Sequence, residues 1–464
     1  MFESTRSIPN QYGRLVSFSR RVAPVNVLHL LPHLRGVERF YWENRRTGFT
    51  LLGFGVATEL MAWGEQRFQT IEHHARQLFD GAFVQHTDPV GKEFAMPRLF
   101  GGFAFRDDFT PDNTWAVFNP AHFILPHYQL VQTSKGAWLT VNVHVLPDEN
   151  PETIIPELQE ALNARWQYLK QLLSEDSPSI HQPPLRDIHY PMAFEAWEQA
   201  IEEAVRAIRA GQLEKVVLAR VAEALFEDAI NIEAALTYLA DTYPDCYRFL
   251  FEPRPNHAFY GATPELLVST DGDTAHTMGL AGSRKRGQTA SEDEQLADDL
   301  FQDPKERHEH NLVVQAIQQR LNALATQLDI PATPQILKLS NIQHLYTPIK
   351  AHGLKTSGVL PLVESLHPTP ALGGTPRAEA MKFIRNAELV PRGWYAAPIG
   401  WIDYRMQGAF AVAIRSAVVQ EKRVWMYAGA GIVGDSVAQK EWDETALKFR
   451  PMMDALHIRE QADA

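Results

Sequence analysis

Two acidic segments of the sequence carry side chains whose spacing could bind a cation. The first, at residues 303–310, reads DPKERHEH, and Asp303, Pro304 and Glu306 are typical of the first turn of a helix. Glu306 is therefore either a capping partner or a ligand. Glu309 falls in line with the apolar residues of the following turns, on the stripe that should face the core. A carboxylate there must be paired, metal-bound or protonated, because burying a bare charge is costly.

The second acidic segment lies near the C-terminus. Ser436 and Gln439 have the spacing of a capping box, and Glu441, Glu444 and Lys448 follow at i, i+3 and i+7 on one helical face. This face is either solvated, with an ordinary Glu444–Lys448 ion pair, or part of a site. Together the two segments offer four carboxylates in two i, i+3 pairs, and such hard oxygen ligands suit Mg²⁺.

Three further charged side chains stand in apolar surroundings. Lys215 opens the strand-like run KVVLA, where it is either an exposed lysine or an inward one whose pKa is lowered by desolvation, a general base. Glu265 follows a Thr-Pro turn and precedes an apolar run, so it is either an exposed turn residue or an acid with a raised pKa. Arg415 lies inside the predicted strand AVAIRSAVV, where an inward guanidinium would bind an anion bidentately.

Two glycine-rich segments could form loops whose backbone N–H groups approach an anion. They are residues 279–287, GLAGSRKRG, and residues 428–431, AGAG. Neither has the Gly-Lys-Ser/Thr ending of a P-loop, and glycine clusters of this kind also occur in ordinary turns. The residues alone leave both interpretations open.

The pattern of apolar residues predicts an α+β protein without regular βαβ alternation. Residues 1–150 alternate short apolar runs with turns, which indicates antiparallel sheet with one amphipathic helix at 65–79. A polar, proline-bearing stretch at 174–185 is the best linker candidate. Further helices are expected at 151–173, 194–208, 291–303, 304–328, 376–387 and 436–456, and strands at KVVLARVAEAL, CYRFLFEP, AFYGA, ELLVST, AFAVAIRSAVV and RVWMYAGAGIV.

Composition excludes several classes of protein. The 464 residues are 45% hydrophobic and 22% charged, and no apolar run reaches the roughly 18–20 residues that cross a bilayer. The N-terminus lacks the apolar stretch of a secretory signal, so a cytoplasmic protein without membrane contact is expected. A net charge of −12 without a basic block argues against a nucleic-acid partner, and local charges must hold any anionic substrate. The single Cys246 is expected to be a buried structural thiol.

A series of motifs resembles, in this order, the chorismate-utilising enzymes: KVVLAR, GATPELLV, GLAGSRKRG, DPKERHEHN, LHPTPALGGTP, RGWYAAPIGW, FAVAIRS and AGAGIVGDS…EWDETALK. This family includes isochorismate, salicylate, anthranilate and aminodeoxychorismate synthases. The resemblance covers about residues 190–458, and LFGGFAF nearer the N-terminus is similar to the isochorismate synthase branch. It implies a compact fold like that of anthranilate synthase component I, with antiparallel sheets and surrounding helices. Residues 1–185 would be a β-rich region completing that fold, and residues 186–464 the chorismate-binding catalytic region.

The resemblance also implies a magnesium-dependent site. Glu309 and Glu444 align with the family's Mg²⁺-binding glutamates, and Glu306 and Glu441 would support them through water. The Mg²⁺ would hold the ring carboxylate of chorismate, with Lys448 nearby. The other substrate-binding positions implied are Ser283, His344, Tyr395, Arg415, Gly429 and Gly431, of which Tyr395 and Arg415 would grip the pyruvyl carboxylate.

Lys215 and Glu265 separate the branches of the family. Lys215 aligns with the lysine that activates water for attack at C2 in isochorismate and salicylate synthases, and Glu265 with the acid that protonates the departing C4 hydroxyl. Anthranilate synthases do not carry this lysine. Aminodeoxychorismate synthases carry a different lysine in a PIKGT-type loop, where this chain reads GLAGS. Two departures are Pro391, where relatives usually have an acidic residue, and Ser283, where many have threonine.

The resemblance therefore implies an isochorismate synthase, an isomerase that adds water at C2 and removes the C4 hydroxyl, in menaquinone or phylloquinone synthesis. A salicylate synthase or a siderophore-pathway isochorismate synthase is the alternative. An aminating anthranilate-type synthase fits less well, because it would need ammonia or a glutaminase partner and this chain has no plausible glutaminase cysteine. A non-catalytic chorismate-binding protein also fits less well, because both catalytic positions and all four glutamates are retained. The expected partner is the small-molecule substrate, with the chain a monomer or a weak homodimer.

Overall fold

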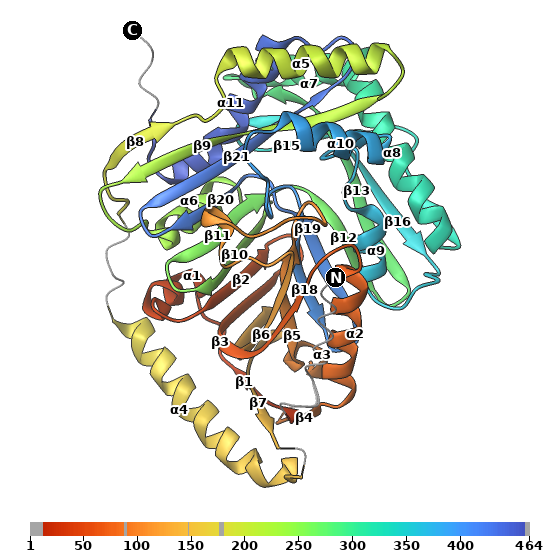
Figure 1. Cartoon of the computed structure of the whole chain (residues 1–464). Coiled ribbons are helices and arrows are strands. Elements are labelled where there is room, and N and C mark those ends of the chain that lie inside the picture. The colour runs from red at the N-terminus through yellow and green to blue at the C-terminus, as the bar shows by residue number, and fades with distance from the viewer. Residues whose placement is uncertain (1–12, 88–90, 147, 176–180, 460–464) are drawn as a thin grey trace.

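The computed structural model describes residues 13–87, 91–146, 148–175 and 181–459. Figure 1 shows a lower part built mostly from N-terminal strands and an upper part in which helices surround C-terminal strands. The first 12 residues, which entered the argument against a secretory signal, lie outside the described residues, and so does part of the predicted linker. No helix in the described ranges is long and apolar enough to cross a membrane.

The N-terminal part of the sheet contains β1 (Arg14–Val22), β2 (Arg39–Asn44), β3 (Phe49–Ala62), β4 (Phe83–His86), β5 (Arg98–Phe103), β6 (Ala121–Thr133) and β7 (Gly136–Val145). Strand β6 is its centre. It pairs with β3 along nearly its whole length, with β5 through its first residues and with β7 through its last residues. β7 continues to β1, and the β1–β4 ladder is the only parallel one among the described strands.

The C-terminal strands extend this sheet in two branches. They are β8 (Leu185–His189), β9 (Lys215–Phe226), β10 (Tyr247–Arg254), β11 (His257–Thr263), β12 (Leu266–Asp271), β13 (Thr274–Lys285), β14 (Gln327–Asp329), β15 (Gln335–Lys338), β16 (Ile342–His352), β17 (Gly374–Thr375), β18 (Pro398–Asp403), β19 (Gly408–Val412), β20 (Ser416–Gln420) and β21 (Arg423–Ile432). One branch runs from β2 through β10, β11, β20 and β21 to β9. The other runs from β5 through β18, β19, β12 and β13 to β16.

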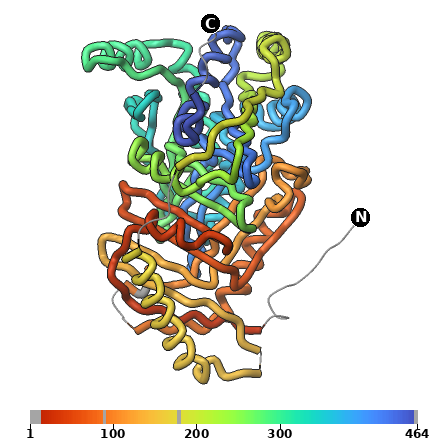
Figure 2. The backbone as a smooth tube through the Cα atoms, turned by 90° about the vertical axis from the view of Figure 1, so that its left-hand side faces the viewer, coloured from red at the N-terminus to blue at the C-terminus, as the bar shows by residue number. Residues whose placement is uncertain are grey.

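Helices cover the outer faces of these branches. They are α1 (Val27–Leu30), α2 (Arg67–Asp80), α3 (Lys92–Ala95), α4 (Ile155–Ser174), α5 (Phe194–Arg209), α6 (Ile232–Thr242), α7 (Ala290–Gln302), α8 (Pro304–Leu324), α9 (Leu360–Leu366), α10 (Arg377–Ala387) and α11 (Ala438–Ala455), with short 3-10 turns η1 (Leu31–Leu34), η2 (Asn113–Trp115) and η3 (Pro151–Ile154). α11 packs on β21 and α5, and α8 packs on β13. In Figure 2, α4 lies low against the N-terminal strands, whereas α5 and α11 lie at the opposite end.

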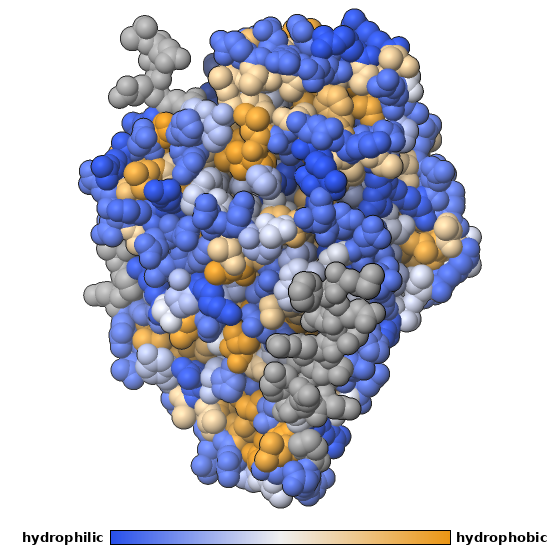
Figure 3. Space-filling view, in the orientation of Figure 1, coloured by the Kyte–Doolittle hydropathy of each residue, from blue (hydrophilic) through white to orange (hydrophobic). Residues whose placement is uncertain are grey.

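The core joins the two parts of the chain. Phe100 of β5 contacts Phe251 of β10, with ring centroids 6.1 Å apart, and Phe251 stacks on Trp394 at 5.0 Å. Cys246 is buried, as predicted, and burial raises the pKa of its thiol to about 12. The surface in Figure 3 is mostly hydrophilic, with hydrophobic residues in small patches. The predicted α+β architecture with antiparallel sheets is confirmed.

Helix α5 shows why much of the local prediction holds. Trp197, Ile201 and Val205 recur at helical spacing and are all buried. The helix ends before Gly211, whose φ of +74° suits a residue without a Cβ. β9 follows at once and is buried along most of its length because β21 and the short strands β8 and β17 flank it.

Two local predictions are wrong. The run AFAVAIRSAVV is not one strand, because the chain passes from β19 in one branch to β20 in the other, and Arg415 at the crossing has a φ of +50°. Ser436 and Gln439 do not form a capping box. Val437 is the N-cap of α11 without a side-chain cap, and the Ser436 hydroxyl accepts instead from the N–H of Val433.

Residues 428–431 lie within a strand, as the predicted strand RVWMYAGAGIV requires, whereas the strand that contains residues 279–285 was not predicted. Gly429 and Gly431 belong to β21, and residues 279–285 belong to β13. In β13 the pairing register with β16 shifts around Gly282, whose φ is +76°. Glycine here permits a bulge and close side-chain packing inside a sheet.

Candidate active site

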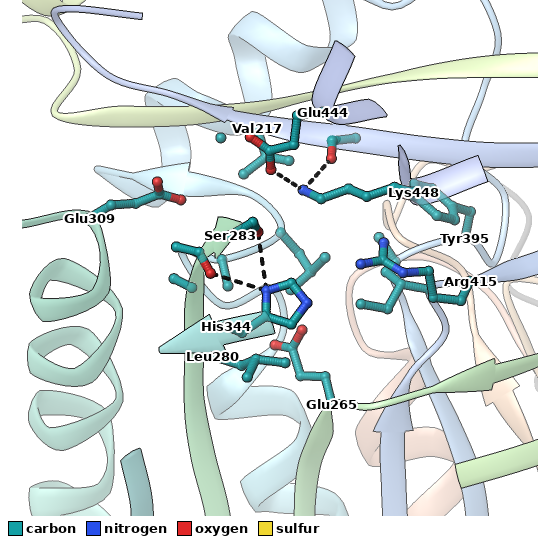
Figure 4. Close-up of a pocket in the computed structure, with 18 of the residues that line it drawn as sticks. Val217, Glu265, Leu280, Ser283, Glu309, His344, Tyr395, Arg415, Glu444 and Lys448 are labelled. Carbon is teal, nitrogen blue, oxygen red and sulfur yellow. Dashed lines mark hydrogen bonds and ion pairs between the residues drawn. The ribbon is translucent and has the colours of Figure 1, made fainter. Parts of the chain in front are cut away.

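A cavity lies where the two branches of the sheet face each other. Its walls come from β9 and β21 of one branch and β13 and β16 of the other, with α8 and α11 contributing side chains (Figure 4). Its empty volume is about 610 Å³, including solvent at its open mouth. The predicted site residues that line it are Glu265, Ser283, Glu309, His344, Tyr395, Arg415, Gly429, Gly431, Glu444 and Lys448. Lys215, Glu306 and Glu441 are not part of this lining.

Lys215 and Glu309 form a buried ion pair beside the cavity. Nζ of Lys215 donates to Oε1 of Glu309 at 2.7 Å, and the Lys215 side chain is only 1% exposed. Burial by itself would raise the pKa of Glu309, but the Lys215 ammonium holds it below its ordinary value. Gly431 makes room for the pair, since a Cβ there would lie 2.6 Å from Oε1 of Glu309. Lys215 thus points inward, one of the two orientations that the sequence left open.

Glu444 and Lys448 lie one turn apart on α11 and face the same cavity. Nζ of Lys448 is 2.6 Å from Oε1 of Glu444 and donates to the carbonyl oxygen of Gly429 at 2.8 Å (Figure 4). Both side chains are largely buried, at 28% and 14% exposure. The pair is therefore not the solvated surface pair that the spacing also allowed. It places an ammonium group over the glycine segment of β21.

Glu306 and Glu441 stand behind the two glutamates that line the cavity. Glu306 does not close a capping box but accepts from the N–H of Ser283 at 3.0 Å. Burial, and then repulsion from the two lining glutamates, raises the pKa of Glu306 to about 7. Burial, and then repulsion from Glu444, also raises the pKa of Glu441. Nζ of Lys305 donates to Glu441 at 3.3 Å and supplies one positive charge to this acidic group.

The fold thus brings both acidic helix faces together, which the spacing alone could not establish. Within the described residues, no three His, Cys, Asp or Glu side chains are arranged as a preformed metal site. Burial and, after it, repulsion between neighbouring carboxylates raise the pKa values of Glu306 and Glu441, and a divalent cation would relieve the repulsion. Mg²⁺ commonly takes one or two carboxylates and completes its shell with water and substrate oxygens. The side chains fit Mg²⁺ held in this shared way.

Arg415 and Tyr395 lie across the cavity from these glutamates (Figure 4). Arg415 is buried at the crossing from β19 to β20, and in the described part of the chain its guanidinium has neither a hydrogen bond nor an ion pair. Burial lowers the pKa of Arg415. The Tyr395 ring stacks on Tyr427, with centroids 5.1 Å apart and planes 19° from parallel. A buried guanidinium without a carboxylate is costly, so this corner is suited to an anionic ligand.

His344 reaches the cavity from β16 as a neutral imidazole. Its Nδ1 lies 3.0 Å from the carbonyl oxygen of Gly282 and 3.1 Å from Oγ of Ser283. The carbonyl can only accept, so Nδ1 carries the proton and Nε2 is left with its lone pair. Burial, with the charges of Arg415 and Lys448, lowers the pKa of His344 to about 3. Nε2 is buried without a partner among the described residues, and is therefore available to a substrate hydroxyl or a water.

Glu265 lies in the short connection between β11 and β12 and is 4% exposed. Burial raises its pKa to about 8, although the charges of Lys215, Arg415 and Lys448 act in the opposite direction. Glu265 is therefore protonated at neutral pH. Of the two interpretations of this residue, the structure supports the buried acid. Figure 4 shows its carboxyl group beneath His344, on the side of the cavity away from Glu444.

Comparison with known proteins agrees with this geometry. A family model described as chorismate binding enzyme matches residues 4–457. The chain belongs to this family. It is 34% identical over 450 residues to isochorismate synthase MenF of Bacillus subtilis, covering 95% of this chain and 93% of that protein. It is 35% identical over 449 residues to the salicylate biosynthesis isochorismate synthase of Pseudomonas aeruginosa, covering 95% and 90%.

A solved structure is similar over the same extent. The menaquinone-specific isochorismate synthase from Escherichia coli superposes with a TM-score of 0.78 and 26% sequence identity, over 96% of this chain and 95% of that one. The resemblance to chorismate-utilising enzymes and the fold that it implies are confirmed. The match also extends through the N-terminal 185 residues, where the motifs indicated only a loose correspondence.

Sequence reasoning missed one polar group of this chorismate-binding enzyme. Arg392, in the RGWY motif, lines the cavity and forms a buried ion pair with Glu388 at 2.6 Å. Its guanidinium also donates to the carbonyl oxygens of Val217 and Leu372, at 2.8 Å each, and Glu388 accepts from the N–H of Ala219. This pair ties β9 to the end of α10. The i, i+4 spacing of the two residues was its only signal, and surface pairs share that spacing.

Proposed function

We propose that this chain is an isochorismate synthase, an isomerase that converts chorismate reversibly to isochorismate. The observation that carries the proposal is the pairing of two groups at one cavity. An inward lysine, Lys215, lies beside the lining, and a carboxyl group that is protonated at neutral pH, Glu265, lies within it. Adding water at one ring carbon and expelling hydroxide from another needs one base and one acid.

The two ends of the cavity suit the two carboxylates of chorismate. Arg415 and Tyr395 are available to the pyruvyl carboxylate, because neither has a hydrogen-bond partner among the described residues. Lys448 and the β21 backbone at Gly429 lie between the Tyr395 hydroxyl and the glutamates, and the ring carboxylate would bind on the glutamate side. Nε2 of His344, between the two ends, can accept a hydrogen bond from a hydroxyl or from water.

In the proposed reaction Lys215 takes a proton from the water that attacks C2, and Glu265 gives its proton to the hydroxyl that leaves C4 as water. One water is added and one is lost, so the net change is an isomerisation. In this structure Nζ of Lys215 donates a hydrogen bond to Glu309, so the lysine must release that hydrogen-bonded proton before its amine can act as a base. A ligand that draws the Glu309 carboxylate away would remove the partner that holds this proton.

Magnesium belongs to the same proposal. Glu309 and Glu444 would bind Mg²⁺ directly, and Glu306 and Glu441 through water. The bound ion would neutralise the ring carboxylate of the substrate and offset the crowded charge of the four glutamates. Lys305 and Lys448 border this group and would orient the glutamates on either side.

The similarity to menaquinone-type isochorismate synthases supports a role in menaquinone synthesis. The 35% identity to a relative named for salicylate biosynthesis keeps a salicylate or siderophore pathway as the alternative for the product's use. We also propose that residues 1–185 complete the catalytic fold, since the β2–β10 and β5–β18 ladders join them to both branches around the cavity.

The test is to incubate the purified chain with chorismate and Mg²⁺ and to resolve the products by chromatography. Isochorismate in equilibrium with chorismate is expected. Accumulating salicylate would instead show that pyruvate is eliminated. Anthranilate formed when ammonium is added would show an aminating enzyme. Lys215→Ala, prepared identically, controls for a contaminating activity and should give no product.

A further inference from the structure

A second polar pocket lies between the N-terminal and C-terminal parts of the chain. The first turns of α2 and α10 form two of its sides, and residues 105–107 and the end of α9 form the others. It encloses about 1290 Å³ of empty volume, including solvent at its mouth. It shares no lining residue with the candidate active site. Nothing in the proposed isomerase reaction uses it.

Arg67, the first residue of α2, is buried in this pocket without a direct ion pair among the described residues, and Asp107 and Glu364 act on it only at longer range. It is 4% exposed, and it forms no ion pair with a described carboxylate. Its two terminal nitrogens reach the carbonyl oxygens of Gly64 and Ala104 only at 3.3 Å, and its Nε is buried with no hydrogen-bond partner. Burial lowers the pKa of Arg67 to about 10. Since a buried charge is normally paired, this guanidinium lacks the partner that its position calls for.

Other arginines add to the positive potential. Arg377, the first residue of α10, is exposed, and has no hydrogen bond or ion pair within the described chain. Arg320 donates to two backbone carbonyls near the end of α9 and likewise has no carboxylate partner there. Burial lowers the pKa of His367 well below its ordinary value, and all three guanidiniums lower it further. Three guanidiniums without a direct ion pair among the described residues therefore surround one buried imidazole.

The two helix starts point to the same kind of ligand. Neither α2, of 14 residues, nor α10, of 11 residues, has a side-chain cap at its N-terminus. Their N-caps are Gln66 and Pro376, and neither provides a hydrogen bond to the first turn. The first N–H groups of a helix and its dipole favour a bound anion. Two such ends and a buried unpaired arginine meet in one pocket.

The lining also contains carboxylates, but none makes a direct ion pair with the two arginines at the helix starts, although Asp107 and Glu364 act on both guanidiniums at longer range. Glu364 accepts a hydrogen bond from Gln69, and burial raises its pKa, whereas Arg67 and Arg377 act to lower it. Glu379 lies 3.9 Å from Lys382 on its own helix. Glu65 and Asp107 lie in the lining without an ion pair to Arg67 or Arg377. Both guanidiniums remain available to an external anion.

We propose that this pocket is a binding site for a small oxyanion, the phosphate or carboxylate group of a compact metabolite. Arg67 and the first turn of α2 would hold the anion from one side, and Arg377 and the first turn of α10 from the other. Phe68 and Phe105 provide apolar surface for a short hydrocarbon part. The site adjoins the catalytic strand, because Thr375, two residues before Arg377, pairs with Lys215 in the β17–β9 ladder.

The test is calorimetric titration of the full chain with inorganic phosphate and, separately, with malonate, at constant ionic strength set by NaCl. Saturable binding of at least one ion is expected, and its identity distinguishes a phosphate site from a carboxylate site. Arg377→Ala should weaken this binding roughly tenfold or more, the effect of losing a charge-assisted hydrogen bond. Its exposed side chain makes no hydrogen bond or ion pair with the described residues, so the variant should fold normally. Arg186 is exposed, lies outside the pocket and has no ion pair with the described residues, so Arg186→Ala should bind these ions as the wild type does.

Three results would overturn the proposal. One is the absence of saturable binding of either ion to the wild type. Another is an unchanged dissociation constant in Arg377→Ala. The third concerns the unpaired Arg415, which could hold the same ions in the candidate active site. Binding that is lost in Arg415→Met and kept in Arg377→Ala would assign them to that site. Turnover of chorismate is measured independently, so a failure of the oxyanion-site proposal is distinguishable from a failure of the proposed isochorismate synthase function.

Discussion

The Glu265→Gln substitution removes the acidic proton from the cavity but keeps the size and most of the polarity of the side chain. The unfolded chain ionises this carboxyl group above its ordinary pKa of 4.5, whereas the folded chain keeps it protonated up to about pH 8. The folded state therefore binds more protons between these values, and stability falls as the pH rises through this window. Above pH 8 both states are ionised, so the loss of folding stability is complete and stays constant.

The decrease in the free energy of unfolding follows from the pKa values of Glu265 in the unfolded and folded chain. Integrated from low pH, it amounts to about 1 kcal/mol at pH 5 and about 3 kcal/mol at pH 7. Glutamine cannot ionise, so the variant avoids this cost and should be more stable than the wild type by these amounts. With an unfolding entropy of about 2.1 cal/mol/K per residue, the gain at pH 7 corresponds to a melting temperature higher by about 3 °C. At pH 5 the gain should shrink to about 1 °C.

The same substitution should lower kcat by about 10²–10⁴-fold, because the departing C4 hydroxyl loses its proton donor. Binding of chorismate, measured by calorimetry, should persist, and the wild-type kcat/KM should fall above about pH 8 as Glu265 ionises. The measurements are differential scanning fluorimetry at pH 5 and 7 and an isochorismate assay. The matched control is Glu198→Gln, on an exposed face of α5, which should change neither the melting temperature nor the rate of isochorismate formation. A stability gain that is equal at both pH values, or retained activity, would refute the assignment of Glu265 as a buried acid.

Three further outcomes are expected. Lys215→Ala should abolish isochorismate formation while chorismate still binds in calorimetry, and full activity in this variant would remove Lys215 as the base. Arg415→Met should raise KM roughly tenfold or more, because a charge-assisted contact to a carboxylate is lost, and an unchanged KM would place the pyruvyl group elsewhere. Chelation with EDTA should stop the reaction and added Mg²⁺ restore it, with Glu309→Gln needing more Mg²⁺ for half-maximal rate. Activity that is insensitive to EDTA would contradict the metal proposal.

Local patterns in the sequence predicted much of the framework. The helical spacing of Trp197, Ile201 and Val205 and the stop at Gly211 predicted α5, because helical faces and caps depend on neighbouring residues. Asp303 was expected to begin a helix, and its carboxylate does accept from the first N–H groups of α8. The partner of Glu306 could not be predicted, since Ser283 is 23 residues away on another strand.

The failures lie where two branches of the sheet meet. AFAVAIRSAVV has the composition of one strand, yet β19 and β20 belong to different branches, and only the pairing of distant strands decides where the chain crosses. The same crossing places Arg415 in the cavity. The Arg392–Glu388 pair was missed for a related reason. Its importance comes from the β9 backbone that it contacts, and β9 is more than 160 residues away in the chain.

The sequence by itself determined which side chains could do the chemistry and which helical faces carry the paired glutamates. It determined the family as well, through motifs read in order. The tertiary structure alone decided that Glu309 meets Lys215, 94 residues distant, that burial keeps Glu265 protonated, and that Arg67 and Arg377 share a second pocket. The physical reason is that faces and caps follow from local spacing, whereas burial and the pairing of charges depend on how distant segments pack.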